Sequence, residues 1–122
     1  MRATRHPKTL SLELTLPSEQ VDTGVLSERL QELAEALERR LAVEGLVARR
    51  VALKLRYADG SSVSRRTTTA SAIAESAEIH AAGLALLRRT QAGTRPVRLV
   101  GLALTELGVA QRDDRQLELF SR

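Results

Sequence analysis

The stretch from residue 51 to residue 66, VALKLRYADGSSVSRR, constrains the fold more than any other part of the chain. Apolar and polar side chains alternate along its first half, with the period of two that sends successive side chains of a strand to opposite faces. The Asp59-Gly60 pair then favours a chain reversal, because glycine tolerates the positive φ of a tight hairpin turn. The stretch therefore predicts a β-hairpin with one face towards a core and the other towards solvent.

The solvent face of this hairpin is expected to be basic. Lys54 and Arg56 alternate with apolar residues and point out together, and the turn is expected to bring Arg65 and Arg66 back beside them. Residues 47–66 hold six basic residues against one acid, a local charge of +5. Basic side chains spaced along a pleated surface can contact successive phosphates, and such contacts hold a nucleic acid without reading its sequence.

Acidic residues gather in a different part of the chain. Residues 22–46 hold six acids against three arginines, a local charge of −3. A domain with one basic and one acidic side attracts a polyanion in a fixed orientation, so this segregation favours nucleic-acid binding. The alternative interpretation of the hairpin is an ordinary solvated strand face, because basic surfaces are common.

Length and composition narrow the class of protein. The 122 residues suffice for one domain with its own core. Cysteine is absent, which excludes disulfides and thiolate metal sites. No apolar run approaches the roughly 20 residues that span a bilayer, and no hydrophobic signal region follows Met1. We therefore expect a soluble, cytoplasmic monomer that makes no membrane contacts.

Hydrophobic periodicity predicts two helices and two further strands around the hairpin. Alternating leucines predict a strand at 8–16, and leucines at steps of three and four predict a helix at about 25–44. After the hairpin, a less regular stripe predicts a second helix at about 72–91, and an apolar run predicts an interior strand at 97–104. The order is β-α-β-β-α-β, an α+β fold with a four-stranded, largely antiparallel sheet and both helices on one face.

Boundary signals divide the chain further. The residues expected to begin or end elements are Pro17 after the first strand, Asp22 or Thr23 as the first N-cap, Gly45 as the first C-cap, and Ser71 and Gly93 around the second helix. Residues 1–7 are predicted to be a lead-in or linker, residues 8–108 the folded domain, and residues 109–122 a flexible tail.

Catalytic chemistry has few candidates. Asp59, Asp113 and Asp114 are carboxylates of the kind that hold metal ions for phosphoryl transfer, but Asp59 has a turn role and the other two lie in the predicted tail. His6 falls in the lead-in and His80 on a helix, where a surface or partly buried position is the simpler interpretation. No nucleophile motif or glycine-rich phosphate loop is present. We expect this chain by itself to catalyse no reaction and to hold no metal.

Three segments, KTLSLELTL, VALKLRYADGSSVSRRTTT and RPVRLVGLAL, follow one another along the chain. In this order they resemble the little finger domain of Y-family translesion DNA polymerases of the bacterial DNA polymerase IV type. KTLSLELTL is similar to the opening strand of that family, VALKLRYADGSSVSRRTTT to its hairpin, and RPVRLVGLAL to its final strand. The matching positions are Lys8, Glu13 and Thr15, then Lys54, Arg56, Tyr57, Asp59 and Arg65, then Arg98, Leu99 and Gly101. The chain departs from the family at Leu16 and Gly60, where aromatic residues are usual, and at Leu12 and Leu14, where polar or basic residues are common.

The resemblance implies a sheet that lies against the major-groove side of a primer-template duplex and contacts its backbone. The DNA-contacting side chains that it implies are Lys8, Lys54, Arg56, Arg65, Arg66 and Arg98. No cofactor is implied for this chain, because Mg²⁺ belongs to the catalytic palm of such polymerases, which has no counterpart in these residues.

The C-terminal sequence QLELF resembles the pentapeptide by which bacterial polymerases bind the sliding clamp. The resemblance implies that Gln116, Leu117, Leu119 and Phe120 contact the clamp. An ordinary terminal strand or helical turn is the alternative interpretation.

Two other functions are consistent with the sequence. A free-standing, non-catalytic homologue that interacts with the clamp and with DNA, without an attached polymerase, has the same motifs. An RNA-binding sheet module is a weaker hypothesis, because the stacking aromatic residues that such sheets use are missing from these strands.

Overall fold

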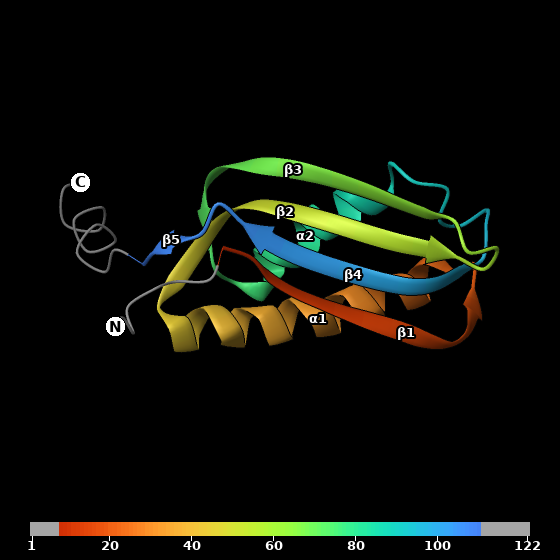
Figure 1. Ribbon diagram of the computed structural model, residues 1–122, viewed down its shortest axis with the longest axis horizontal. Helices are drawn as coiled ribbons and strands as arrows, with labels where there is room; N and C mark the ends of the chain where they lie inside the picture. Colours follow the sequence, from red (N-terminus) through yellow and green to blue (C-terminus); the bar gives the residue numbers. More distant parts are fainter. Residues whose placement is uncertain (1–7, 111–122) are drawn as a thin grey trace.

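The computed structural model describes residues 8–110 (Figure 1). Its elements, in chain order, are β1 (Leu10–Gln20), α1 (Thr23–Glu44), β2 (Leu46–Tyr57), β3 (Ser62–Ile73), α2 (Ser76–Leu87), β4 (Val97–Thr105) and β5 (Gly108–Val109). This order confirms the predicted β-α-β-β-α-β arrangement and adds the two-residue β5. No helix in this part of the chain is long and apolar enough to cross a membrane.

The main sheet has the strand order β1-β4-β2-β3, and each neighbouring pair is antiparallel (Figure 1). The interior strands β4 and β2 carry most of the buried apolar residues, whereas the edge strand β3 is mostly polar. The short β5 pairs with the beginning of β2. Beyond it, the amide of Ala110 donates to the carbonyl oxygen of Gly45 at 2.8 Å, so ordered contacts extend past the boundary expected at residue 108.

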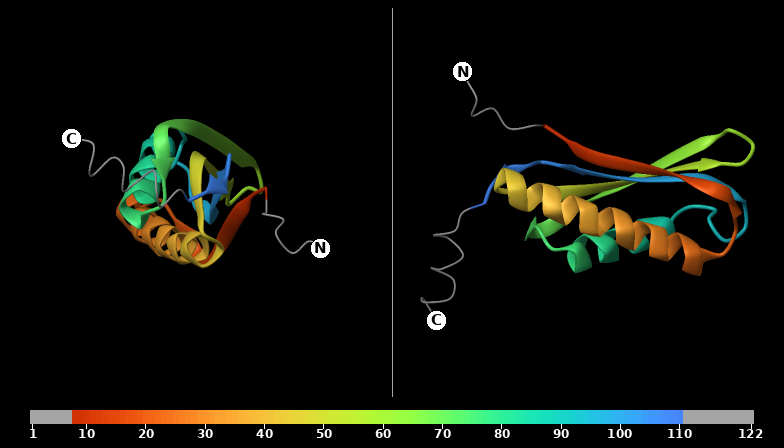
Figure 2. Two further views of the ribbon diagram at one scale, coloured as in Figure 1. Left: turned by 90° about the vertical axis from the view of Figure 1, so that its left-hand side faces the viewer. Right: turned by 90° about the horizontal axis from the view of Figure 1, so that it is seen from below.

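Both helices lie on one side of the sheet and leave the other side uncovered (Figure 2). The leucine stripe predicted for the first helix is buried between α1 and the strands, at Leu26, Leu30, Leu33, Leu37 and Leu41. From α2, Ile79, Leu86 and Leu87 join the same aliphatic core. The prediction of two helices on one face is therefore confirmed.

The ends of α1 follow the sequence signals. Asp22 is the N-cap, and its Oδ1 accepts a hydrogen bond from the amide of Gly24 at 2.8 Å. At the other end, Gly45 has φ 67°, the left-handed conformation that glycine adopts without a steric penalty. Asp22, and not Thr23, is therefore the N-cap of α1.

The second helix begins later than predicted. β3 continues to Ile73, so Ser71 lies in a strand and does not cap a helix. The β-branched run 67–69 favours an extended chain, and pairing with β2 holds it in the sheet. Glu75 is the N-cap instead, in a capping box with Glu78. The helix also ends earlier than predicted, at Leu87 with Arg88 as the C-cap, so Gly93 does not cap it.

The first strand is longer than predicted. β1 continues through Pro17 to Gln20, but its register against β4 shifts between Thr15 and Gln20. Proline has no amide hydrogen to donate to a ladder, so it interrupts the regular pairing at the sheet edge without ending the extended chain.

Candidate nucleic-acid interface

Four rows of residues make up the side of the sheet that no helix covers, which we call the open face. Partners in an antiparallel ladder point to the same side of the sheet, so the register defines each row. The rows are Ser11–Ala103–Ala52–Arg66, Glu13–Gly101–Lys54–Ser64, Thr15–Leu99–Arg56–Ser62 and Thr105–Arg50–Thr68. Their neighbours along β2, including Leu53 and Leu55, point into the core.

The centre of the open face is hollowed. The hollow has a volume of about 210 Å³, and its lining includes the small residues Ala52, Gly101 and Ala103. Ser11, Ser64, Glu13 and Lys54 also line it. A polyanion with a convex surface can therefore approach the backbone of the sheet closely at this point.

Lys54 lines this hollow, and two further basic side chains lie nearby on the open face. Lys54 and Arg56 lie two residues apart on β2 and share the open face, as the alternation predicted. Arg66 of β3 joins them, in the row next to that of Lys54. Among residues 8–110, neither Arg56 nor Arg66 forms an ion pair or a side-chain hydrogen bond, so both guanidinium groups are available to a ligand.

Arg65 does not lie on the open face. It pairs with Leu53, whose side chain is buried on the helix side, so Arg65 projects from that side at the edge of the sheet. One of its guanidinium nitrogens donates to the carbonyl oxygen of Ser64 at 2.9 Å. The expectation that Arg65 and Arg66 both return beside Lys54 was wrong for Arg65, because consecutive residues of a strand point to opposite faces.

The other two basic residues implied by the family resemblance, Lys8 and Arg98, lie at the periphery. Lys8 is exposed, two residues before the start of β1. Arg98 is exposed on β4, where the register against β2 shifts, and its Nη1 lies 4.0 Å from Oε2 of Glu19. The structure places both residues outside the four rows.

One acid lies among the cations of the open face. Oε2 of Glu13 is 3.2 Å from Nζ of Lys54, although their strands are separated by β4. Gly101 lies between them in the same row. The alternation of residues 8–16 puts Glu13 on the polar face of its strand, but no local pattern predicts this contact, because the contact depends on the strand order.

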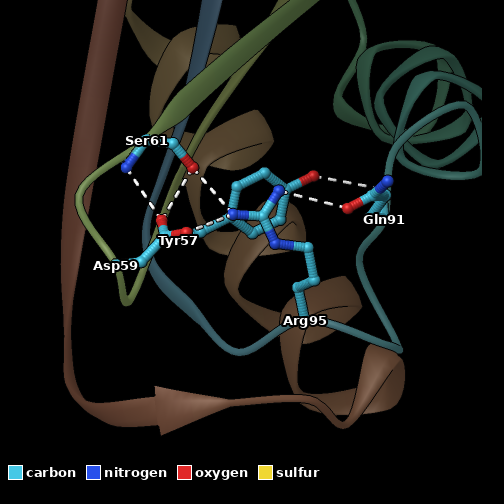
Figure 3. Close-up of polar contacts among 5 residues, drawn as sticks. All are labelled: Tyr57, Asp59, Ser61, Gln91 and Arg95. Carbon is cyan, nitrogen blue, oxygen red and sulfur yellow. Dashed lines mark hydrogen bonds and ion pairs between the residues drawn. The ribbon is translucent and has the colours of Figure 1, made fainter.

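A second polar cluster fixes the tip of the hairpin (Figure 3). The guanidinium of Arg95 lies 4.0 Å from the centroid of the Tyr57 ring and donates to Oδ2 of Asp59 at 2.6 Å, to Oγ of Ser61 at 2.8 Å and to Oε1 of Gln91 at 3.1 Å. The backbone amide of Gln91 donates a hydrogen bond to the Tyr57 hydroxyl at 3.0 Å. We call these five residues the Arg95 cluster. The Arg95 cluster joins the β2–β3 turn to the loop between α2 and β4. The contacts of Arg95 were not predicted from the sequence.

Asp59 has the turn role predicted from the sequence. Its Oδ1 accepts hydrogen bonds from the amide and the hydroxyl of Ser61, at 2.9 and 2.7 Å, while Gly60 has φ 93°. The hydrogen bonds from Ser61, followed by the charge of Arg95, lower the pKa of the Asp59 carboxyl below its ordinary value. This carboxylate is thus ionised and engaged at neutral pH.

The remaining titratable candidates have structural positions or lie outside the described residues. Within residues 8–110, no three His, Cys, Asp or Glu side chains are placed to hold a metal ion. Nε2 of His80 lies 3.1 Å from Oγ and 3.0 Å from the carbonyl oxygen of Ser27, so His80 joins α2 to α1. The residues outside the described part are His6, Asp113, Asp114 and the clamp-binding candidates Gln116, Leu117, Leu119 and Phe120.

The acidic residues of α1 lie on the side of the sheet opposite the open face (Figure 2). The exposed acids along the helix are Glu28, Glu32, Glu35 and Glu44. The charge segregation seen in the sequence is therefore also a segregation between the two sides of the sheet.

Comparison with known proteins identifies related sequences and folds. The family described as the impB/mucB/samB family C-terminal domain matches residues 7–119. DNA polymerase IV of Halorhodospira halophila is 41% identical over 121 residues, which cover 99% of this chain and 33% of that protein. This chain thus spans about a third of the length of the curated relatives that it matches.

Solved structures share the fold. A complex of the beta-clamp processivity factor and the little finger domain of PolIV matches with a TM-score of 0.64 and 26% identity, covering 80% of this chain and 86% of that chain. A chimera of Y-family DNA polymerases matches with a TM-score of 0.69, covering 86% of this chain and 30% of that chain. Its identity is 18%, so this second match shows the fold alone.

Proposed function

The chain belongs to the impB/mucB/samB family of C-terminal domains, which includes the little finger domains of bacterial DNA polymerase IV, and on that premise we propose that its open face binds the backbone of a primer-template duplex. One observation carries the proposal. Lys54, Arg56 and Arg66 gather on the only side of the main sheet that the described helices leave uncovered.

The spacing of these cations suits a regular polyanion. Lys54 and Arg56, two residues apart on one strand, are separated by about 6.8 Å along it, and neighbouring strands lie about 4.8 Å apart. Arg66 lies on the adjacent strand, so the three cations are spread across the strands as well as along one of them. Arginine and lysine at such positions bind phosphates and leave the bases unread, so the binding is expected to be independent of sequence.

The acidic side of the domain supports a single binding orientation. Exposed glutamates on α1 repel phosphates from the helix side, while the open face attracts them. Lys8 and Arg98 extend the proposed contact surface at its periphery. Arg65, on the helix side, is assigned no contact with a duplex bound to the open face.

The C-terminal motif supports a second contact, with a sliding clamp. A solved relative of this fold is a little finger domain in complex with the beta-clamp processivity factor. In this chain the candidate residues 116–120 lie outside the described part, so the proposal rests on the motif QLELF. A clamp contact raises the local concentration of the open face on the DNA that the clamp encircles, so two weak contacts combine into longer retention.

Salt-dependent DNA binding tests the proposal. Fluorescence anisotropy with a labelled primer-template is measured at several salt concentrations for the parent chain and for the double variant Arg56→Ala, Arg66→Ala. The parent is expected to give a log-log slope of about −3 to −4, and the double variant a slope flatter by about 1.8, because each lost phosphate contact accounts for about 0.9.

A charge-matched control separates this face from a general charge effect. The double variant Arg39→Ala, Arg40→Ala removes the same charge from exposed positions on α1. It is expected to leave the slope within the error of the parent. If both double variants lowered binding equally, or if neither did, the assignment of the open face would be withdrawn.

A further inference from the structure

The ion pair between Glu13 and Lys54 occupies the centre of the open face. Nζ of Lys54 lies 3.2 Å from Oε2 of Glu13 and donates a hydrogen bond to it, so the ion pair is also a hydrogen bond. The two side chains are 49% and 42% exposed, so a ligand that docks on the open face reaches both. Lys54 thus differs from Arg56 and Arg66, which have no acidic partner among the described residues.

Gly101 makes this contact possible. Glu13, Gly101 and Lys54 form one row across three strands, and the two charged side chains meet above the glycine. A Cβ at position 101 would lie 3.0 Å from Cγ of Glu13 and 3.3 Å from the carbonyl oxygen of Leu12. Gly101 does not have a positive φ, so its role here is to leave space and not to permit an unusual backbone conformation.

Lys54 cannot bind a phosphate and keep its full interaction with Glu13. The carboxylate lies within hydrogen-bonding distance of the ammonium group, in the position from which a phosphate oxygen would approach above the hollow.

We infer that Glu13 is an intramolecular competitor for the phosphate that Lys54 binds, and that it keeps the DNA affinity of the open face below the level its cations allow. This inference rests on the proposed function of the open face. Its consequence is a weak, salt-sensitive contact in which Arg56 and Arg66 are permanently available and Lys54 becomes available only when Glu13 is displaced. A contact of this kind releases DNA readily.

The test is a double-mutant cycle on DNA binding with four chains: the parent, Glu13→Gln, Lys54→Gln, and both substitutions together. Each is titrated with the same primer-template by fluorescence anisotropy over a range of salt. Glu13→Gln is expected to tighten binding about two- to fivefold, the change that corresponds to one exposed ion pair. Its salt slope is expected to become steeper by about 0.9, because one more cation meets a phosphate. In the Lys54→Gln background, Glu13→Gln is expected to change neither quantity.

Glu32→Gln is the matched control. Glu32 is an exposed acid of α1, paired with Arg29 at 2.8 Å, and its substitution makes the same change in net charge on the opposite side of the sheet. It is expected to leave the affinity and slope near those of the parent.

Three outcomes overturn the inference. Glu13→Gln can change the DNA affinity and the salt slope no more than Glu32→Gln does, which means that the ion pair does not limit binding. It can weaken binding, which means that Glu13 positions Lys54 for DNA. Its gain can persist without Lys54, which means that Glu13 acts only by repelling DNA directly. None of these results affects the proposed function, which fails separately if Arg56→Ala with Arg66→Ala leaves binding unchanged.

Discussion

The guanidinium of Arg95 stacks on the ring of Tyr57, with 4.0 Å between its central carbon and the ring centroid (Figure 3). The contact joins the last residue of β2 to the loop that precedes β4, and Asp59 extends it to the tip of the hairpin. The orientation of the β2–β3 hairpin, and with it that of the open face, therefore depends on residues outside the hairpin.

This cluster predicts a lowered pKa for the Asp59 carboxyl, measurable by NMR titration of its carboxyl carbon. Ser61→Ala and Arg95→Ala are each expected to raise that pKa towards the ordinary value of an aspartate, because each removes a group that stabilises the ionised form. A pKa that neither substitution changes would contradict the hydrogen-bonded arrangement.

The same shift determines the sign of a pH effect on stability. A carboxyl whose folded-state pKa is lowered stabilises the fold above its unfolded-state pKa, and this contribution is lost as the pH falls through the folded-state value. We expect Asp59→Asn to reduce the midpoint of urea unfolding at pH 7 and to have progressively less effect below about pH 4. An equal decrease in the unfolding midpoint at pH 7 and below about pH 4 would show that the charge of Asp59 is not involved.

The helix packing predicts a large difference between two truncations on α1. Leu37 is fully buried under the sheet, so Leu37→Ala is expected to reduce the free energy of unfolding by about 2 to 5 kcal/mol. Val43, on the same helix, is 83% exposed, and Val43→Ala is expected to change it by less than about 0.5 kcal/mol. Chemical denaturation of both variants checks the prediction, and similar losses would show that the assigned buried face of α1 is wrong.

The strand register predicts different effects for adjacent arginines. Arg66→Ala is expected to weaken binding to the primer-template and to reduce the salt slope by about 1. Arg65→Ala, one residue away and on the helix side, is expected to leave the slope unchanged. Anisotropy titrations decide between them, and a larger effect at Arg65 would mean that DNA binds a different side of the sheet.

The QLELF motif predicts binding to a sliding clamp. A peptide of residues 112–122 is expected to bind a bacterial clamp with micromolar affinity, about −8 kcal/mol, because apolar anchors such as Leu119 and Phe120 can enter a preformed groove. Replacing both Leu119 and Phe120 by alanine is expected to abolish the heat signal in isothermal titration, whereas Glu118→Ala, which leaves the apolar anchors in place, serves as the control. Binding that survives loss of both anchors would remove the docking role from the motif.

The isolated chain is predicted to extend no primer. Within residues 8–110 no carboxylate cluster is placed to hold the metal ions of phosphoryl transfer. A gel assay with Mg²⁺, a primer-template and all four dNTPs checks this expectation. Extension by a preparation free of other polymerases would require a catalytic site that the proposed function does not include.

The sequence by itself determined the local features of this protein. The alternation in residues 51–57, the leucine stripe of α1, the cap at Asp22 and the left-handed Gly45 are all set by neighbours a few residues away, so each could be recognised without a structure. The same period of two also implied that Arg65 and Arg66 point to opposite faces, although their shared charge suggested one patch.

Only the tertiary structure decided which distant residues meet. Glu13 and Lys54 are 41 residues apart, and their contact requires β4 to lie between β1 and β2 with Gly101 in the same row. The Arg95 cluster and the late start of α2 depend in the same way on the loop before β4 and on the pairing of β3 with β2. Strand order and register are fixed by the burial of apolar faces over the whole sheet, a long-range energy that no local sequence pattern contains.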